Sequence, residues 1–238
     1  MAGNQPPIYL QIRELVRTKI EEGEYAPGTA IPSEAELAEQ YGINRQTVRN
    51  AIDTLVNEGL LRRVPGKGVY VLGRKMGRNL DELQGFTQTM LDEHLTPSTK
   101  VISKLIRKAR DKYSLMFGIQ PEDDIYYIKR LCCVNNEPVS LEEIYIPRYI
   151  VPKMEGIDLS IFSVYEVYDF YGIKLECARQ TLDLVHLEQN DANMLGIDVK
   201  LPVMLFECTT YDDRRRIIEF NRNYVRGDKC SFSVHFKK

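Results

Sequence analysis

Residues 27–72 hold the feature that most constrains the fold, which is a pair of short helical segments separated by a glycine. Ser33 is a good N-cap, and Glu36, three residues later, completes a capping box. Gly42 then interrupts the helical pattern, and Asn44 can cap a second helix. The spacing therefore predicts two helices joined at a tight turn, which is the helix-turn-helix arrangement.

A short β-hairpin is predicted directly after the second helix. Two strand-like pieces, residues 60–64 and 69–72, are joined by the turn sequence Pro65-Gly66-Lys67-Gly68. The tip of this hairpin is basic and rich in glycine, as in the wing of a winged helix-turn-helix. Because the second helix of such a motif enters the major groove, the module predicts DNA binding.

Charge is unevenly distributed along this part of the chain. Residues 1–43 carry three basic and seven acidic side chains, a net charge of −4. Residues 44–75 carry seven basic and two acidic side chains, a net charge of +5. Positive charge is thus concentrated on the second helix and the wing, where the phosphates of bound DNA would lie.

Four neighbouring residues at the start of the second helix are candidate DNA contacts. Arg45 and Arg49 lie one helical turn apart and project from the same face. Gln46 and Thr47 beside them are polar groups able to meet phosphate oxygens or base edges. The alternative is that the arginines belong to an ordinary solvated helix face.

The segment resembles the winged helix-turn-helix of the GntR family of bacterial transcription regulators over about 65 residues. The resemblance rests on Ile8-Tyr9-Leu10-Gln11-Ile12, Gly28, Pro32-Ser33-Glu34, Glu36-Leu37-Ala38, Tyr41-Gly42, Arg45, Thr47-Val48-Arg49, Ala51, Leu55, Glu58-Gly59-Leu60-Leu61 and Gly66-Lys67-Gly68. It implies that Arg45 and Arg49 contact base edges or phosphates, Thr47 the backbone, and the wing tip the minor groove. The expected DNA-binding residues are therefore Ser33, Asn44, Arg45, Gln46, Thr47, Arg49, Gly66, Lys67 and Gly68.

One position departs from the family pattern. Many family members have an arginine that contacts DNA where this chain has Ala35. The operator sequence of a relative therefore cannot simply be transferred to this chain.

Length and composition fit a two-part protein. The chain of 238 residues predicts a winged helix-turn-helix domain over 1–72, a short basic linker over 73–79 and a second domain over 80–238. A helix over about 9–20, with apolar residues at helical spacing, is expected to pack behind the two helices of the helix-turn-helix. A content of 43% hydrophobic residues is ample for two cores.

Composition also narrows the class of protein. A net charge of −2 and a pI near 6.0 argue against a protein that coats DNA without regard to sequence. The sequence shows no apolar run of about 18 residues and no signal-peptide pattern, so no membrane association is expected. Five cysteines without CxxC spacing predict reduced thiols in the cytoplasm, and three scattered histidines predict no metal site and no cofactor.

Hairpin-like patterns dominate the second half of the chain, and the spacing of βαβ units is absent. The patterns predict strands over 101–108, 125–134, 139–146, 174–186, 203–212, 217–226 and 230–236, with helices over 83–93, 112–117, 163–170 and 187–195. The expected fold class is α+β, with an antiparallel sheet and peripheral helices in the second domain.

This second domain resembles the UTRA ligand-binding domain of the HutC subgroup of the GntR family, whose fold is similar to that of chorismate lyase. The match rests on Phe86-Thr87, Met90, Thr96-Pro97-Ser98, Leu115, Gly118, Arg130, Asn136, Pro138, Glu142, Tyr145-Ile146-Pro147, Ser163-Val164-Tyr165, Ala192, Leu195-Gly196, Pro202-Val203, Glu219 and Arg226-Gly227-Asp228. In relatives that bind sugar phosphates, the ligand pocket uses the positions that match Arg130, Glu142, Ser163, Tyr165 and Glu219. The expected effector-binding residues are Phe86, Thr87, Arg130, Glu142, Ser163, Tyr165 and Glu219.

The chemistry of this set suits a small anionic metabolite. An arginine fork grips an anion, and carboxylates and hydroxyls accept hydrogen bonds from sugar or amine groups. A helix that begins at Phe86-Thr87 would offer backbone N–H groups to a phosphate or carboxylate. The alternative is that Arg130, Glu142 and Glu219 form a structural ion pair inside the sheet.

Two departures affect the class of ligand. Cys132 stands where the sugar-phosphate-binding relatives have a second basic residue, and Val225 stands where they have an aromatic one. The neighbouring Tyr224 could replace the latter if the alignment shifts by one residue. The pair Cys132-Cys133 could also be a redox switch, but two buried small side chains are favoured because adjacent strand residues face opposite sides.

Several tyrosines leave two interpretations open. Tyr126 with Tyr127, and the set Tyr165, Tyr168 and Tyr171, either line a pocket or belong to the core or to dimer packing. The spacing of the residues does not separate these two readings.

Together, the two resemblances imply a homodimeric repressor that binds a roughly palindromic operator in double-stranded DNA and is released by a small anionic metabolite. Two alternatives remain open at this point. One is an enzyme, because the second domain resembles a lyase fold, although the chain shows no nucleophile–base pair. The other is a DNA-binding protein with a dimerisation domain and no small-molecule effector.

Overall fold

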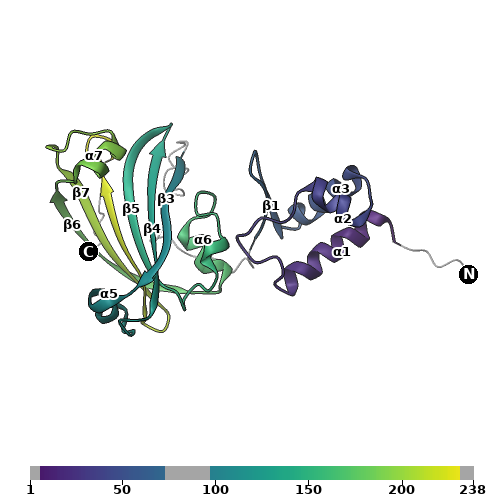
Figure 1. Cartoon of the computed structure of the whole chain (residues 1–238), viewed down its shortest axis with the longest axis horizontal. Helices are drawn as coiled ribbons and strands as arrows, with labels where there is room; N and C mark the ends of the chain where they lie inside the picture. Colours follow the sequence, from purple (N-terminus) through teal and green to yellow (C-terminus); the bar gives the residue numbers. More distant parts are fainter. Residues whose placement is uncertain (1–5, 73–96, 231–238) are drawn as a thin grey trace, which may run out of the picture. The chain divides into compact units, whose positions relative to one another are not determined.

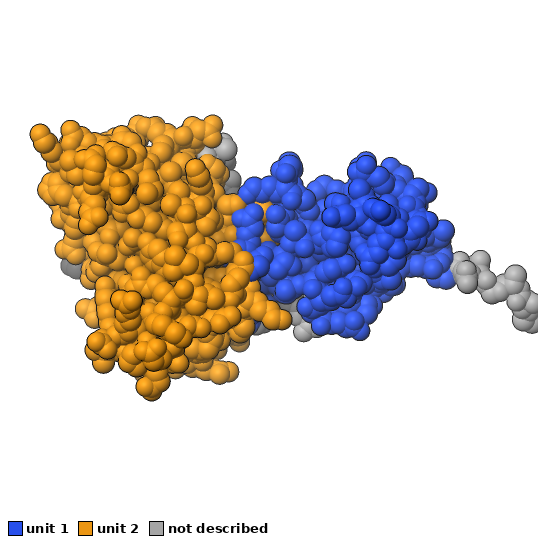
Figure 2. Space-filling model, viewed as in Figure 1, with its two compact units in different colours: residues 1–77, 156–158, 166–172 blue, residues 78–155, 159–165, 173–238 orange. Residues whose placement is uncertain are grey.

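The computed structural model describes residues 6–72 and 97–230. These residues form two compact units, shown in different colours in Figure 2. The first unit contains 6–72 with 156–158 and 166–172, and the second contains 97–155, 159–165 and 173–230. The expected linker, residues 73–79, lies outside the described residues, so the domain boundaries stay a prediction.

Residues 6–72 form a helical bundle with a hairpin, as Figure 1 shows. The elements are α1 (Ile8–Glu21), α2 (Glu34–Tyr41), α3 (Arg45–Asn57), β1 (Leu61–Val64) and β2 (Gly68–Val71). The strands β1 and β2 pair antiparallel, and Val64 faces Gly68 at the turn. The winged helix-turn-helix predicted from the sequence is confirmed.

The capping residues explain where α2 and α3 begin. The Ser33 hydroxyl accepts a hydrogen bond of 3.2 Å from the Glu36 N–H, and the Glu36 carboxylate accepts one of 2.7 Å from the Ser33 N–H. The predicted capping box is therefore present. Gly42 ends α2 in the left-handed conformation, with φ of +64°, which a side chain would disfavour.

Each of the three helices contributes one side to a shared core. The buried apolar residues come from the helices, the wing and the loop before α2, and they are Ile12, Val16, Ile31, Leu37, Ala38, Val48, Ala51, Ile52, Leu55, Leu61, Val69 and Val71. Burial of apolar surface is the main stabilising contribution to such a bundle. The opposite, solvent-facing side of α3 is left free to carry polar residues.

Residues 97–230 form a six-stranded antiparallel sheet with the strand order β3-β4-β5-β8-β7-β6 (Figure 1). The strands are β3 (Pro97–Lys108), β4 (Asp124–Val134), β5 (Glu137–Pro147), β6 (Leu175–Val185), β7 (Val203–Asp212) and β8 (Ile217–Val225). The helical elements are α5 (Arg110–Phe117), the 3-10 turn η1 (Met154–Gly156), α6 (Val164–Phe170) and α7 (Gln189–Leu195).

The two faces of this sheet have different coverings. Alternate residues of the central strands, Leu141, Tyr145, Phe220 and Tyr224, pack against α5 or α7. Their neighbours along the same strands point to the other face, because strand side chains alternate. The face opposite α5 and α7 therefore carries a different set of residues, and the candidate ligand site lies there.

The α+β fold class expected from the sequence is confirmed. The helices and strands expected between residues 97 and 230 are found with bounds that differ by a few residues, the largest difference being that β3 begins at Pro97. The helix expected over 83–93, and all but the first residue of the strand expected over 230–236, lie outside the described residues. Among the described helices, none is long and apolar enough to span a membrane.

Candidate nucleic-acid interface and ligand site

The first turn of α3 presents its polar side chains to solvent. Asn44 caps the helix by accepting a hydrogen bond of 2.8 Å from the Thr47 N–H and one of 2.9 Å from the Thr47 hydroxyl. Arg45, Gln46 and Arg49 are all exposed. The cap therefore fixes the start of the helix at the point where its exposed face becomes basic.

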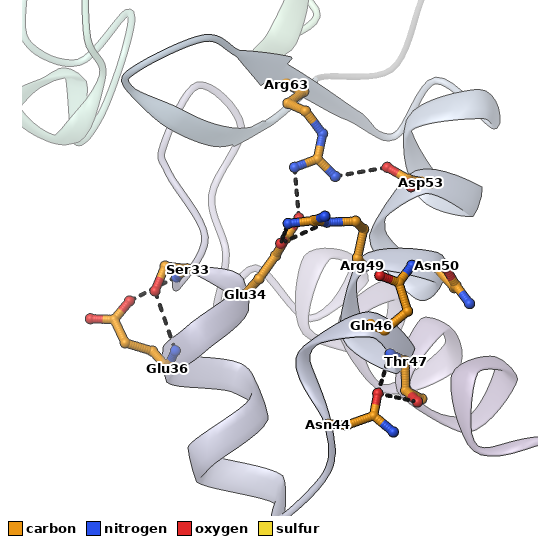
Figure 3. A network of polar contacts seen from close by, with 10 residues as sticks. All are labelled: Ser33, Glu34, Glu36, Asn44, Gln46, Thr47, Arg49, Asn50, Asp53 and Arg63. Atoms are coloured by element: carbon orange, nitrogen blue, oxygen red, sulfur yellow. Dashed lines mark hydrogen bonds and ion pairs between the residues drawn. The ribbon is translucent and has the colours of Figure 1, made fainter.

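Arg45 and Arg49 differ in how their side chains are held. No ion pair of Arg45 is found among the residues that the structure describes. Arg49, by contrast, donates two hydrogen bonds to the Glu34 carboxylate, from Nε at 3.1 Å and from Nη2 at 2.9 Å (Figure 3). The side chain of Arg49 is thus oriented by Glu34 on α2, whereas no ion pair with another described residue holds the side chain of Arg45.

The same carboxylate reaches the wing. The Arg63 guanidinium on β1 donates a hydrogen bond of 2.7 Å to Glu34 Oε1 and another of 2.7 Å to Asp53 Oδ1 on α3 (Figure 3). The hydrogen bond from Arg49 is the largest influence that lowers the pKa of Glu34, and Arg63 adds to it. Glu34 is therefore charged at neutral pH and joins the helix to the hairpin.

The tip of the wing has the conformation that its glycines permit. Gly66 and Gly68 have φ values of +72° and +121°, in the region that favours glycine. The Lys67 N–H closes the turn on the Val64 carbonyl at 3.1 Å. Lys67 is exposed at this tip, and a narrow, basic and side-chain-poor tip can approach a groove closely.

The structure brings most of the predicted DNA-binding residues into two groups. Arg45, Gln46, Thr47 and Arg49 lie within the first five residues of α3, which Asn44 caps. Gly66, Lys67 and Gly68 form the wing tip, and Ser33 caps α2. The residues that connect these groups, Glu34, Asp53 and Arg63, were not predicted from the sequence. Their pairing is non-local, and only the charge of Arg63 gave a signal.

The candidate ligand site is built on a row of paired residues across three strands. Arg130 on β4 lies opposite Glu142 on β5, which lies opposite Asn223 on β8. The Arg130 guanidinium donates to Glu142 Oε2 from Nη2 at 2.6 Å and from Nε at 3.0 Å, and Nη1 reaches the Leu159 carbonyl at 3.4 Å. Both side chains of this pair are buried.

Two further predicted residues lie near this pair. Glu219 shares a strand face with Asn223, because the two residues are four apart on β8, and it is 1% exposed. Burial, and then the nearby charge of Glu219, raise the pKa of the Tyr165 hydroxyl. Burial is the largest single influence on the pKa of the Arg130 guanidinium and lowers it, but the charge and hydrogen bond of Glu142, together with other neighbours that include Glu219, raise the pKa overall. Arg130, Glu142, Tyr165 and Glu219 therefore influence one another electrostatically.

Of the three remaining residues that were predicted to bind the ligand, only Ser163 is among the described residues. Ser163 is half-buried and directly precedes α6, and Phe86 and Thr87 lie outside the described residues. The ion pair weighed in the sequence analysis is present between Arg130 and Glu142. Glu219 contributes to it through its charge.

Two asparagines on the same strand face were missed by the sequence analysis. The side-chain Oδ1 atoms of Asn221 and Asn223 are buried, and neither has a hydrogen-bond partner among the described residues. Buried polar atoms are normally paired, so these two oxygens mark a place where donors of a bound molecule would be stabilised. The alternation of Glu219, Asn221 and Asn223 along β8 was the available signal.

The cysteines and tyrosines are also placed. Cys132 is fully buried, burial raises the pKa of its thiol, and Cys133 is half-buried on the same strand. This environment fits a neutral buried thiol and not a reactive one. Tyr126 and Tyr168 are core residues. Among the described residues, no group of three or more His, Cys, Asp or Glu side chains could hold a metal ion.

Comparison with known proteins identifies both parts of the chain. The model of the "Bacterial regulatory proteins, gntR family" matches residues 8–71, and the model of the "UTRA domain" matches residues 92–231. The two matches define a transcription regulator with a DNA-binding part and a UTRA part. The chain belongs to the GntR family, and within it to the HutC-type regulators that carry a UTRA domain.

Similar proteins align over nearly the whole chain. The transcriptional repressor NagR of Bacillus subtilis is 35% identical over 97% of this chain and 94% of its own length. The mannosyl-D-glycerate transport/metabolism system repressor MngR of Escherichia coli is 25% identical over 96% of this chain and 95% of its own length. The crystal structure of PhnF from Mycobacterium smegmatis has a TM-score of 0.61 at 25% identity and covers 95% of this chain and 100% of that one.

These findings confirm the function class expected from the sequence. The chain is a DNA-binding transcription regulator, and its relatives are regulators and not enzymes. The lyase-like enzyme weighed in the sequence analysis is therefore excluded by its family.

Proposed function

We propose that this chain is a cytoplasmic homodimeric repressor whose two heads bind the two halves of a pseudo-palindromic operator. In each head, Arg45, Gln46, Thr47 and Arg49 enter the major groove at the start of α3. The tip Gly66-Lys67-Gly68 follows the adjacent minor groove, and Ser33 and Asn44 meet phosphates at the ends of the two helices.

A single observation carries this assignment, which is the exposure of Arg45 and Arg49 on one face at the capped start of α3. In the helix-turn-helix geometry the N-terminal residues of the second helix are those that contact base edges. A bidentate arginine contact with guanine contributes about 1–3 kcal/mol of discrimination against the wrong base. Two such arginines per head are enough for sequence-specific binding by a dimer.

A homodimer matches the pseudo-palindromic operator that we propose, because a two-fold DNA site is matched by a two-fold protein. The strand β6 lies at one edge of the sheet, and Leu182 and Leu184 on it are exposed. An exposed apolar edge strand is a ready surface for pairing with another chain. A combined Leu182→Glu and Leu184→Glu variant should sediment as a monomer at concentrations where the parent protein is a dimer.

The effector that we propose is a small anionic metabolite that carries sugar-like hydroxyl groups. Arg130 would meet the anion through Nη1, since its present contact of 3.4 Å with the Leu159 carbonyl is weak. Glu142, Ser163, Tyr165 and Glu219 would hold the hydroxyl groups, and Phe86-Thr87 would add backbone N–H groups. The name of the relative MngR, which refers to a glycosylated organic acid, supports this class.

The second candidate is a purely structural role for the Arg130–Glu142 pair, which its short and buried geometry favours. In that case the domain would hold the dimer together without an effector. The Oδ1 atoms of Asn221 and Asn223 on the same face, which have no hydrogen-bond partner within residues 6–72 and 97–230, favour a bound molecule instead.

An effector changes DNA binding only if it binds one arrangement of the dimer more tightly than the other. We propose that the metabolite favours an arrangement in which the two heads no longer match the spacing of the half-sites. The winged helix-turn-helix itself stays folded in this mechanism. Release from DNA thus requires no unfolding of either head.

The test of this function begins with DNA sequences selected by the protein from a random library. Selected sequences should show two inverted half-sites. Sequences without such a repeat would contradict the proposal that a dimer binds the operator.

The effector is tested by thermal unfolding in the presence of a panel of sugar phosphates, amino-sugar phosphates and sugar-linked organic acids. A ligand at ~100 times its Kd should stabilise the protein by about 2.7 kcal/mol. Tyr165→Phe should weaken this effect, and a panel without any shift would favour the purely structural role.

A further inference from the structure

Glu34 occupies an unusual place for a charged residue of a DNA-binding surface. It is the first residue of α2, its side chain is only 9% exposed, and it accepts hydrogen bonds from two arginines (Figure 3). A carboxylate here is negative where DNA phosphates would approach. It therefore weakens the sequence-independent attraction between this surface and DNA. We looked for another contribution of Glu34 that offsets this loss.

The geometry shows what this carboxylate holds. Oε2 accepts from both Nε and Nη2 of Arg49 on α3, and Oε1 accepts from Nη1 of Arg63 on β1. One side chain thus connects the recognition helix with the wing through separate oxygens. Asp53 repeats the connection, because it accepts from the other terminal nitrogen of Arg63.

Stability alone is a poor explanation for this arrangement. The side chains of Arg49 and Arg63 are 51% and 40% exposed, and exposed ion pairs contribute little to the free energy of unfolding. Orientation is a better explanation. A long arginine side chain loses rotamer freedom when it binds, and a guanidinium that is already oriented loses less. The Nη1 group of Arg49 takes no part in the hydrogen bonds to Glu34 and remains a donor for DNA.

We propose that Glu34 is a positioning residue that sets the sequence discrimination of the head. It orients Arg49 and Arg63 before DNA arrives, which favours the correct operator. It also repels phosphates, which disfavours DNA of any other sequence. The inference rests on the DNA interface proposed above, and it predicts that loss of Glu34 moves the two affinities in opposite directions.

The experiment compares full-length Glu34→Gln with the parent protein on two duplexes. One is a sequence selected by the parent protein, and the other is a shuffled duplex of equal length and base composition. Fluorescence anisotropy should give a loss of roughly tenfold on the selected duplex, within the range of one bidentate contact. On the shuffled duplex, the affinity should rise about two- to threefold, because one negative charge is lost from the phosphate-facing side.

Glu39→Gln is the matched control. Glu39 lies on the same helix and is exposed, and its removal changes the net charge equally while leaving Arg49 and Arg63 in place. It should change both affinities by less than about twofold, because exposed charges away from the interface are screened by salt. Glu34→Asp keeps the charge but shortens the side chain, so it should lose affinity for the selected duplex without a gain on the shuffled one.

The outcomes separate three explanations. A parallel loss on both duplexes with a lower melting temperature means that Glu34 only supports the fold, and it overturns the proposal. Unchanged affinities in Glu34→Gln, with a loss in Arg49→Ala, overturn the role of Glu34 but leave the interface intact. Unchanged binding by Arg49→Ala means instead that the proposed interface itself is wrong.

Discussion

The protein contains two arginine–glutamate pairs that are chemically alike and differ in burial. Arg49 and Glu34 meet at 2.9 Å in the head, and the arginine is half exposed. Arg130 and Glu142 meet at 2.6 Å in the sheet, and both side chains are more than 90% buried. An exposed pair can exchange one partner for a phosphate or a base at little cost. A buried pair is stable only as long as both members stay, because neither charge can be hydrated.

The effect of an ion pair therefore depends on whether its surroundings allow its charges to be hydrated. In the head, Glu34 holds a donor that remains accessible from solvent. In the sheet, Glu142 compensates a charge that the core could not otherwise contain. The same two residue types therefore form a pair with an accessible donor in one region and a mutually compensated buried pair in the other. The following variants test what this difference means for stability and for binding.

The largest effect is expected for Glu142→Ala. Removal of one member leaves the buried Arg130 charge uncompensated, which lowers the free energy of unfolding by about 3–5 kcal/mol. Urea denaturation measures this change. The counterpart variant in the head, Glu34→Ala, should cost less than about 1 kcal/mol, because the arginines that it leaves behind are 51% and 40% exposed and can be hydrated. Equal losses in both variants would remove the distinction between the two pairs.

A matched double variant tests whether the buried charge itself causes the expected loss of stability. Arg130→Met combined with Glu142→Leu replaces the buried pair by apolar side chains of similar size. Its stability should recover to within about 1–2 kcal/mol of the parent protein, or exceed it, because no charge remains buried. A double variant as unstable as Glu142→Ala would show that packing, and not charge compensation, explains the loss.

A smaller effect is expected at the helix caps of the head. Ser33→Ala removes the acceptor for the Glu36 N–H and should lower the free energy of unfolding by about 1 kcal/mol. Ser33→Gly should cost only a few tenths of a kcal/mol, since glycine is tolerated at this position. Thermal unfolding of the two variants checks the order. A larger loss for glycine would contradict the capping role.

Lys67→Ala is expected to act mainly on DNA binding, because the ion pair of Lys67 with Asp158 at 3.5 Å is partly exposed and contributes little to stability. The exposed lysine at the wing tip should contribute attraction to phosphates, so its loss should reduce the slope of log K against log salt by about 1. The preference for the selected over the shuffled duplex should stay the same. A change in preference with an unchanged slope would assign Lys67 to base reading instead.

The smallest effect concerns pH. The hydrogen bond from Arg49 lowers the pKa of Glu34 in the folded protein, so this carboxylate stabilises the fold above its unfolded pKa of about 4.3. The contribution is lost as the pH falls from there through the lowered pKa. Melting temperatures measured over this acidic range should fall less steeply in Glu34→Gln than in the parent protein. Identical profiles would mean that the pair does not persist in solution.

Local signals were sufficient to predict much of this architecture. Ser33, Gly42 and Asn44 determine where the helices of the head start and stop, and their roles depend only on neighbours within a few residues. The turn at Asn135 and Asn136, where both residues have positive φ, likewise marked the β4–β5 hairpin. Such features are visible in sequence because the interacting groups are close together along the chain.

Contacts between residues far apart along the chain could not be predicted from the sequence. The placement of β8 between β5 and β7 brings Asn223 opposite Glu142, although 81 residues separate them. Glu34 and Arg63 meet for the same reason, since the fold of the wing decides which acid faces which base. Charge counting located the basic region but could not identify the acid that orients it.

The most direct test is the affinity of full-length Arg49→Ala for the selected duplex, with its thermal transition measured on the same sample. We expect a loss of at least about tenfold in affinity and a melting temperature close to that of the parent protein. Unchanged affinity would contradict the claim that the exposed pair serves recognition. A collapse of the thermal transition would mean that Arg49, like Arg130, is needed for the integrity of its domain.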